Sequence, residues 1–376
     1  MNKCRFAIDL LWVRPNKVGG VESYIRNILD GLLNINENFE AYLIVSIDNC
    51  ETFQKYSKDK RFIIIRCNVQ SEHVPKRIIW QNCQLGKKLK DINVDVCFEP
   101  HNYIPFFRVR HVKFIATIHD LQLIHYPENF DLKKRMWFKF NWANTIKKAK
   151  RIIVISNFVK EDLLNNYPKA KDKTNTIYNS IIVNDKECDS EEQIKEKFGV
   201  ERNEFYYTVA SLMPHKNLKT IIDVIDEIKG KHINLPSKLL ISGVGGKLEN
   251  ELIEQLKEKN LNENIQLTGY VKNSERNALY KNCRAFLFPS VFEGFGMPNI
   301  EASYMGARVI TTKESCMLEV TQGKAEYVNN PYDKNEWIEI MSKEKDSQLD
   351  EIDFERYSIK EITQQYFNLI KGVCNC

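Results

Sequence analysis

Residues 285–312, AFLFPSVFEGFGMPNIEASYMGARVITT, decide the fold class. The run AFLFPS predicts a buried strand, and Gly294 and Gly296 break the loop that follows it. Pro298 suits the first position of a helix and Gly306 suits its end, after which ARVITT predicts a second buried strand. A strand, a helix and a second strand in this order are typical of α/β sheets with parallel strands.

Two carboxylates lie within this stretch, Glu293 in the loop and Glu301, eight residues later, in the expected first turn of the helix. Carboxylates accept hydrogen bonds from hydroxyl groups, and the N–H groups at a helix start favour an anion. These features predict a polyhydroxylated and partly anionic ligand, such as a sugar nucleotide. The alternative is that Glu301 only complements the helix dipole and that Glu293 is an ordinary surface residue.

The rest of the chain repeats this alternation of β-branched runs and amphipathic segments. Because 376 residues exceed what one core normally supports, we expect two domains. The polar, acidic segment 183–204 predicts a connection with one short helix. Two similar α/β units are therefore expected at residues 1–185 and 203–356, with the ligand in the cleft between them. The predicted strands are 5–11, 40–46, 62–67, 94–100, 113–119, 151–156, 205–212, 238–243, 265–271, 285–290 and 307–312, and the predicted helices include 21–33, 218–229, 249–259 and 275–281.

The net charge of +5 is unevenly distributed, since residues 1–180 contain 30 Lys and Arg against 18 Asp and Glu. A basic first half is expected to face an anionic membrane surface or a phosphorylated substrate, unless the imbalance only reflects solvated surface. No nucleic-acid recognition motif accompanies the charge, so nucleic acid is not an expected partner. No apolar run reaches the roughly 18 residues that a membrane-spanning helix needs.

The ten cysteines are scattered and form no C-x-x-C pair. Several lie in apolar segments, so we expect buried, reduced thiols. The N-terminus predicts a buried strand rather than a signal peptide, which together with reduced thiols indicates the cytoplasm. The terminal residues 374–376, CNC, are expected to form a frayed tail rather than a metal site.

The pattern E-G-F-G-x-P followed by the second glutamate resembles the signature of the family-four retaining glycosyltransferases. The resemblance implies the GT-B fold, which is α/β with two Rossmann-like doubly wound domains facing each other across a cleft. It also implies that a C-terminal helix, at about residues 357–376, crosses back to complete the first domain. Other segments that resemble the family cover nearly the whole chain in order: GGVESYIRNIL, TIHDLQLIHYPE, RIIVISNFVKEDL, TIYNSI, ASLMPHKNLKTIIDVI and LTGYV.

The resemblance also implies roles in binding the donor. Glu293 would face the hydroxyls of the donor sugar, and Glu301 would bind the ribose hydroxyls of the nucleotide. Backbone N–H groups around Phe295, Gly296 and Met297 would assist Glu293. The two glutamates therefore need not form an acid/base pair.

Lys216 would bind the donor diphosphate, whereas an ordinary solvated lysine is the alternative. The family usually has an arginine where this chain has Ser211, so phosphate neutralisation would depend on Lys216 and helix N–H groups. His215 stands where some relatives have an arginine, and its role stays open. The backbone near Tyr270 and Val271 would meet the nucleobase.

In the first half, the resemblance places a loop that faces the acceptor and a phosphate at Gly19 and Gly20, although a glycine pair can also be a simple turn. His119 would line the donor-sugar pocket and the reaction centre, with a structural histidine as the alternative. The segment 239–250, LLISGVGGKLEN, fits neither the dinucleotide fingerprint nor the P-loop pattern, and is expected to be a turn near the nucleotide.

The function that follows is metal-independent, retaining transfer of a hexose from a nucleotide-diphosphate sugar, with His119, Lys216 and Glu293 at the reaction centre. GDP-mannose is the expected donor, and the acceptor is a glycan or a lipid-linked oligosaccharide in surface polysaccharide synthesis. No cofactor and no metal are expected, since no D-x-D motif follows a strand. The alternatives are a non-catalytic binding subunit and a GT-B sugar-nucleotide epimerase.

Residues 131–151 are both basic and aromatic, and this composition suits docking on an anionic membrane surface. The protein would then be peripheral at the inner face of the membrane. The alternative is an ordinary core-packed helix whose Trp and Phe side chains face inward.

Overall fold

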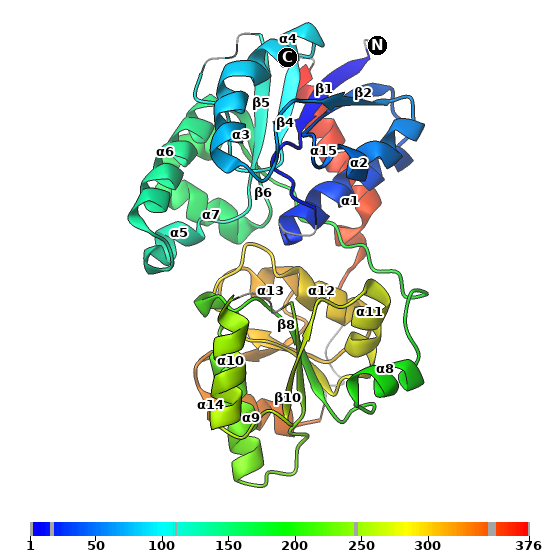
Figure 1. The fold of residues 1–376 in the computed structure, drawn as a ribbon, viewed down its shortest axis with the longest axis vertical. Helices are drawn as coiled ribbons and strands as arrows, with labels where there is room; N and C mark the ends of the chain where they lie inside the picture. Colours follow the sequence, from blue (N-terminus) through cyan, green and yellow to red (C-terminus); the bar gives the residue numbers. More distant parts are fainter. Residues whose placement is uncertain are drawn as a thin grey trace. The chain divides into compact units, whose positions relative to one another are not determined.

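The structure is a computed structural model that describes residues 3–15, 19–107, 109, 111–243, 247–344 and 351–374. The chain divides into two compact units (Figure 1). Unit 1 consists of Met1–Ile182 and Glu355–Cys376, and unit 2 consists of Val183–Phe354. Within the described residues, no helix combines the length and the apolar character that crossing a membrane would require.

Unit 1 is built on a seven-stranded sheet of parallel strands in the order β3-β2-β1-β4-β5-β6-β7. The winding direction reverses between β1 and β4, so the carboxyl ends of these strands form the topological switch point. The strands are β1 (Cys4–Asp9), β2 (Phe39–Val45), β3 (Phe62–Arg66), β4 (Val96–Glu99), β5 (Lys113–Ile118), β6 (Ala149–Val154) and β7 (Thr174–Thr176). The α-helices are α1 (Gly20–Asn34), α2 (Cys50–Phe53), α3 (Val74–Trp80), α4 (Gly86–Asp91), α5 (Gln122–His125), α6 (Leu132–Lys148), α7 (Asn157–Asn166) and α15 (Ile359–Cys374), with a π-helical turn at Gln81–Leu85 and 3-10 turns at Gln54–Lys58, Pro127–Asn129, Pro168–Lys173 and Glu355–Tyr357.

Unit 2 repeats this plan with a six-stranded parallel sheet in the order β10-β9-β8-β11-β12-β13. Its switch point lies between β8 and β11. The strands are β8 (Tyr206–Val209), β9 (Leu239–Ser242), β10 (Ile265–Gly269), β11 (Ala285–Phe288), β12 (Val309–Thr312) and β13 (Glu326–Val328). The helices are α8 (Glu191–Phe198), α9 (Leu218–Gly230), α10 (Lys247–Glu258), α11 (Asn273–Asn282), α12 (Met297–Tyr304), α13 (Met317–Val320) and α14 (Lys334–Ser342), with a 3-10 turn at Pro214–Lys216.

The central strands read as continuous apolar runs because both faces of each sheet are covered by helices. Every residue of β4, β9, β11 and β12 is buried. This is the pattern expected of parallel strands, and the predicted fold class is confirmed. The short strands β7 and β13 were not predicted, since each has only three residues, TNT and EYV.

The segment expected to connect the domains belongs to unit 2. Ser190 and Gln193 form a capping box at the start of α8, and Gly199, with φ 65°, ends the helix. An ion pair of 2.5 Å between Lys197 and Glu275 holds α8 against α11. The predicted short helix is therefore part of the packed structure of this unit.

The last helix, α15, completes unit 1 (Figure 1). It packs on α1, β1 and β4. The ring of Phe367 lies 5.5 Å from that of Phe39. The helix continues through Cys374, so this residue is not in the frayed tail expected for 374–376, and the last two residues lie outside the described part of the chain.

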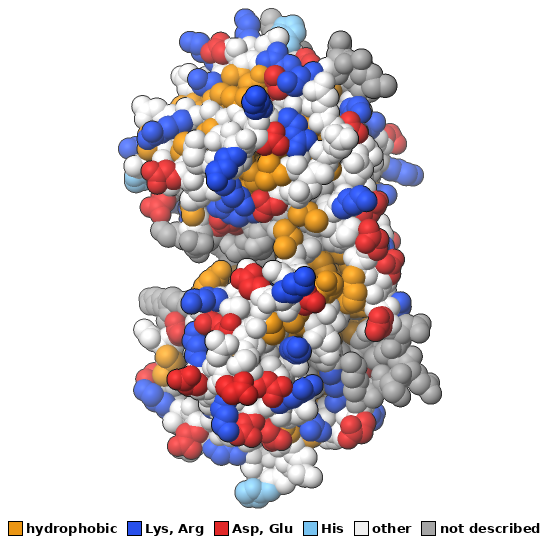
Figure 2. Space-filling view, turned by 90° about the vertical axis from the view of Figure 1, so that its right-hand side faces the viewer, with side chains coloured by type: hydrophobic (Ala, Val, Ile, Leu, Met, Phe, Trp, Pro, Cys, Tyr) orange, Lys and Arg blue, Asp and Glu red, His pale blue; other side chains and the backbone are white. Residues whose placement is uncertain are grey.

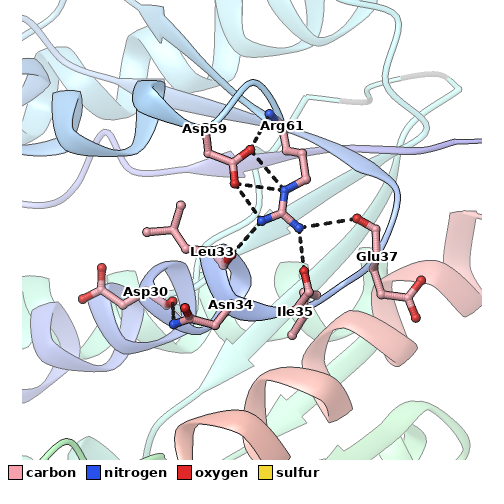
Figure 3. A network of polar contacts seen from close by, with 7 residues as sticks. All are labelled: Asp30, Leu33, Asn34, Ile35, Glu37, Asp59 and Arg61. Carbon is pink, nitrogen blue, oxygen red and sulfur yellow. Dashed lines mark hydrogen bonds and ion pairs between the residues drawn. The ribbon is translucent and has the colours of Figure 1, made fainter.

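Arg61 fastens the end of α1 to the sheet (Figure 3). Its guanidinium pairs with Asp59 at 2.7 Å and donates to the carbonyl oxygens of Leu33 and Ile35 at 2.7 and 2.6 Å. The last carbonyls of a helix lack intrahelical partners. Arg61 therefore satisfies this helix end and holds the turn that leads into β2.

Gly31 lies at a tight contact between α1 and α15. A Cβ atom at Gly31 would lie 1.9 Å from Thr363 Oγ1 and 2.8 Å from Thr363 Cβ. Thr363 is fully buried. The contact therefore admits no side chain at Gly31 unless the helices move apart.

Replacing Gly31 by Ala is expected to lower the free energy of unfolding by about 1–3 kcal/mol, because the added methyl group overpacks the contact between α1 and α15. Urea unfolding followed by circular dichroism measures this change. Gly230→Ala is the control, since a Cβ atom there meets nothing within 4 Å. Equal unfolding midpoints for the two variants would contradict the expectation.

Candidate functional site

Two neighbouring loops meet at the switch point of unit 2. One follows β8 and contains His215 and Lys216, and the other follows β11 and contains Glu293. The backbone N–H of Val291 donates to the His215 carbonyl at 2.8 Å. Because this bond joins the loops, side chains from two separate strand ends converge.

Lys216 and Glu293 form an ion pair at this point. Their side chains are 20% and 14% exposed. Ser290 Oγ donates to Glu293 Oε1 at 2.8 Å, and the Glu293 N–H donates to Ser315 Oγ at 3.1 Å. The carboxylate is therefore oriented by its own loop as well as by the lysine, and the two opposite charges neutralise each other.

His215, the neighbour of Lys216 in the sequence, is buried. Burial, with a smaller contribution from the Lys216 cation, lowers the pKa of His215 to about 4. The imidazole is consequently neutral near pH 7 and adds no positive charge to the site. Lys216 is thus the charged group of this loop that faces Glu293.

The loop after Glu293 turns into α12 through Gly296, which has φ 73° and is the N-cap of the helix. Met297 is the first helical residue, and Phe295 is buried. Glu301 is the fifth residue of α12, so the expectation that it lies in the first turn was wrong. Since the helix dipole acts mainly on the first turn, it does not account for a carboxylate at this position.

Glu301 is buried among groups from α11. Tyr280 Oη donates to Glu301 Oε2 at 3.3 Å, and Arg276 Nε lies 3.6 Å from the same oxygen. Burial alone would lower the pKa of Arg276, but attraction to Glu301 and smaller contributions from neighbouring tyrosines together outweigh it, so the pKa is raised. Arg276 Nε has no hydrogen-bond partner among the described residues. The sequence reasoning missed both residues, although a spacing of four places them on one helix face.

Tyr270 and Val271 follow β10 and differ sharply in exposure. The Tyr270 side chain is 88% exposed, whereas Val271 is buried. The carbonyl of Gly269 accepts a hydrogen bond from the Gly243 N–H at 3.0 Å. The predicted turn after β9 continues into residues 244–246, which lie outside the described part of the chain.

In unit 1, Gly19 is the N-cap of α1 and Gly20 is its first residue. Gly19 has φ 58°, and a Cβ atom at either glycine would meet nothing within 4 Å. No described residue therefore blocks the approach of a ligand to the backbone at this helix start. Residues 16–18, directly before it, lie outside the described residues.

His119 directly follows β5, and its ring is held from two sides. Its Nε2 atom lies 2.9 Å from the Pro100 carbonyl oxygen, and the Tyr24 ring packs edge-on at 4.7 Å. Burial lowers the pKa of His119 to about 4. A carbonyl oxygen only accepts hydrogen bonds, so Nε2 carries the proton and Nδ1 remains an acceptor. Tyr24 Oη in turn lies 2.9 Å from Tyr366 Oη of α15.

Two carboxyl groups that the sequence reasoning did not pair meet at the switch point of unit 1. Asp9 ends β1, Glu99 ends β4, and their buried carboxyl groups are hydrogen-bonded to each other. Leu11 N–H and Gln81 Nε2 donate to Asp9 at 2.9 and 2.6 Å. Burial and then the Asp9 carboxylate raise the pKa of Glu99 well above its usual value. Burial raises the pKa of Asp9 too, but its hydrogen-bond donors oppose this rise, so Glu99 is the partner that keeps the proton and donates to Asp9.

Two family models match the chain and together cover most of it. The model described as Glycosyl transferases group 1 matches residues 189–360, and the model described as Glycosyltransferase Family 4 matches residues 18–184. The chain belongs to the family-four glycosyltransferases.

Similar proteins agree with this assignment. The chain is 29% identical to the O-antigen chain mannosyltransferase RfbU of Salmonella typhimurium over 63% of its length and 61% of the relative. It is 25% identical to the O-antigen chain mannosyltransferase B of Escherichia coli over 69% of its length and 65% of the relative. Both matches thus span less than two thirds of the relatives.

A solved structure supports the same fold. Anabaena Alr3699/HepE, in complex with UDP and glucose, superposes with a TM-score of 0.72 over 98% of this chain and 100% of that chain. The two sequences are only 15% identical, so this comparison shows a shared fold and nothing further. Two parallel-sheet α/β domains are common to both.

Changing Glu99 to Gln is expected to remove a pH dependence of stability. The raised pKa means that the native family-four chain holds a proton that the unfolded chain releases above about pH 4.3. The free energy of unfolding of the wild type should therefore fall, relative to Glu99→Gln, by up to about 1.4 kcal/mol per pH unit until the folded pKa is passed. Denaturant unfolding at pH 5 and pH 8 measures the free energy of unfolding of both proteins. The contribution of the histidines is the same in both proteins, so it cancels when the two values at one pH are subtracted. A constant difference would contradict the protonated pair.

Proposed function

We propose that this chain is a retaining glycosyltransferase that moves a hexose from a nucleotide-diphosphate sugar to a glycan or lipid-linked oligosaccharide in surface polysaccharide synthesis. The observation that carries the proposal is the Lys216–Glu293 ion pair at the switch point of unit 2, beside the helix that carries Glu301. The names of both O-antigen relatives support the same class of reaction.

On donor binding, Lys216 would pair with the diphosphate and Glu293 with the sugar of the same ligand. The diphosphate would compete with Glu293 for the Lys216 ammonium, and the released carboxylate would accept hydrogen bonds from the sugar hydroxyls. Each charge then exchanges one partly buried partner for another. Because Ser290 also holds Glu293 at 2.8 Å, the carboxylate would stay in place during the exchange.

The nucleoside would lie against the cluster of Glu301, Arg276 and Tyr280. Glu301 would accept from the ribose hydroxyls, and the exposed Tyr270 ring offers a surface for the base. The Arg276 guanidinium lies beside Glu301, and its Nε–H, which has no hydrogen-bond partner among the described residues, would donate to the nucleotide. This arrangement would fix the donor at both ends of its diphosphate.

Catalysis would depend on stabilising the leaving group. The departing nucleoside diphosphate gains negative charge as the sugar bond breaks, and Lys216 would offset that charge. An oxygen of the donor phosphate would take the proton of the attacking acceptor hydroxyl on the same face, which gives retention. His119 is neutral, so it would contribute a hydrogen bond rather than a cation.

GDP-mannose is the proposed donor, because both O-antigen relatives are named mannosyltransferases. We expect GDP-mannose to raise the melting temperature by several degrees at about 100 times its dissociation constant, while UDP-glucose and dTDP-rhamnose do so less. Glu301→Gln and Arg276→Ala should each weaken this binding about tenfold or more. If no member of the panel stabilises the wild type, the donor-binding proposal fails.

Glu293→Ala and Lys216→Ala are expected to lower kcat by about 100-fold or more, because each removes a charged group from the donor centre. Release of nucleoside diphosphate from the stabilising donor measures turnover, and circular dichroism checks the fold. Glu254→Ala and Lys257→Ala are the controls, since these residues form an exposed ion pair of 2.9 Å in α10. Undiminished turnover in the first pair of variants would exclude their assigned roles.

Helix α6 is partly core-packed and partly exposed, so the alternative of a core-packed helix for 131–151 describes only one of its faces. Trp142 is buried, and Trp137 packs 5.5 Å from Phe106. Leu132, Met136 and Phe140 are nevertheless 72%, 60% and 62% exposed. Because these three residues are spaced by four, they form one outward apolar stripe.

We propose that this stripe docks on an anionic membrane surface and brings the enzyme to a lipid-linked acceptor. Helix α6 contains five Lys and one Arg and no acidic residue. On the face drawn in Figure 2, unit 2 has acidic and basic side chains side by side. An apolar stripe within a purely basic helix suits the boundary between anionic headgroups and acyl chains.

The triple variant Leu132→Ser, Met136→Ser, Phe140→Ser is expected to lose most of its co-sedimentation with phosphatidylglycerol-containing vesicles, because the inserted apolar area is removed. Leu318→Ser with Tyr332→Ser is the control, since both side chains are exposed in unit 2. Wild-type binding that is equal with pure phosphatidylcholine vesicles, or unchanged in the triple variant, would contradict the proposal.

A further inference from the structure

Two cysteines from opposite ends of the chain meet in unit 1. Cys4 is the first residue of β1, and Cys374 is the last residue of α15. Their Sγ atoms lie 2.8 Å apart. Non-bonded heavy atoms usually approach to about 3.5–4.0 Å, and a disulfide bond is about 2.05 Å long. The two thiols are therefore closer than an ordinary packing contact.

The surroundings of the pair differ between its two members. Cys4 is buried, whereas Cys374 is partly exposed. The hydrogen bond from Cys4, with a smaller contribution from Lys113, lowers the pKa of the Cys374 thiol. Lys113 Nζ donates to the Val373 carbonyl at 3.1 Å, which keeps this cation beside the end of α15. Cys374 is thus the accessible member with the greater thiolate character.

We propose that Cys4 and Cys374 form a disulfide bond when a small-molecule disulfide, such as oxidised glutathione, is present. The Cys374 thiolate attacks one sulfur of the oxidant, forms a mixed disulfide and releases one reduced thiol. The Cys4 thiol then loses its proton and attacks Cys374 Sγ, which releases the second reduced thiol. The protein loses two protons and two electrons, and the oxidant takes up both as it becomes two reduced thiols.

The bond would fasten α15 to the sheet of unit 1. The same helix carries Tyr366, whose Oη lies 2.9 Å from Tyr24 Oη, and the Tyr24 ring packs edge-on against His119. The disulfide bond between Cys4 and Cys374 would therefore hold in place the helix that packs near His119. It does not depend on the proposed transfer reaction, since it follows from the contact between two thiols alone.

The experiment uses the full chain with Cys376→Ser, because trypsin releases residues 372–376 as one peptide that otherwise contains two cysteines. After treatment with oxidised glutathione and blocking of free thiols, mass spectrometry should find residues 4–5 joined to 372–376. The exposed Cys83 is the internal control and should be recovered as a blocked or glutathionylated thiol. Recovery of both Cys4 and Cys374 as blocked thiols, or joined to other cysteines, would overturn the proposal.

A second measurement uses stability. Oxidation should raise the melting temperature of the Cys376→Ser protein by about 5 °C or more, because the cross-link closes almost the whole chain. Adding Cys4→Ser or Cys374→Ser should abolish this rise, whereas adding Cys83→Ser should leave it unchanged. If oxidation still raises the melting temperature of the Cys4 and Cys374 variants, other thiols cause the effect, and the proposed disulfide bond is contradicted.

Discussion

Each sheet reverses its winding direction between two central strands, and the groups described above depend on this constraint. In unit 2 the reversal brings the loops after β8 and β11 together, and one backbone hydrogen bond between Val291 and His215 fixes their register. Lys216 and Glu293 can then pair, although 77 positions separate them in the sequence. In unit 1 the same reversal brings Asp9 and Glu99 together. The chemistry of the chain is concentrated where the strand order changes.

The two switch points differ in electrostatic character. The switch point of unit 1 contains a protonated carboxyl group, and the neutral His119 lies at the end of the neighbouring strand β5. These polar groups therefore act through directed hydrogen bonds. The switch point of unit 2 contains a partly buried ion pair, which can exchange partners with a charged ligand. Under the proposed function, an anionic diphosphate would find its electrostatic partner in unit 2. A neutral sugar or acceptor would then meet the hydrogen-bonding groups of unit 1.

Much of the fold was predictable because the relevant signals are local. Gly296, Pro298 and Gly306 mark the limits of α12. The apolar runs of β11 and β12 indicate a parallel sheet whose faces are covered by helices. The contacts that complete the site are long-range and leave no such signal. Arg276 acts on Glu301 only because α11 packs beside α12, and Asp9 and Glu99 each interrupt an apolar run without indicating a partner. The turn of α12 that carries Glu301 was misplaced because the helix start depends on a left-handed glycine.

Helix α15 has a consequence for the order in which the protein is made. Unit 2 is continuous in sequence, so all of its strands and helices exist once residue 354 has been synthesised. Unit 1 begins first but needs α15, whose apolar face packs on α1, β1 and β4. Those surfaces stay uncovered until α15 has left the ribosome. The domain that starts first is therefore completed last, and a fragment that ends after β7 would lack part of its own core.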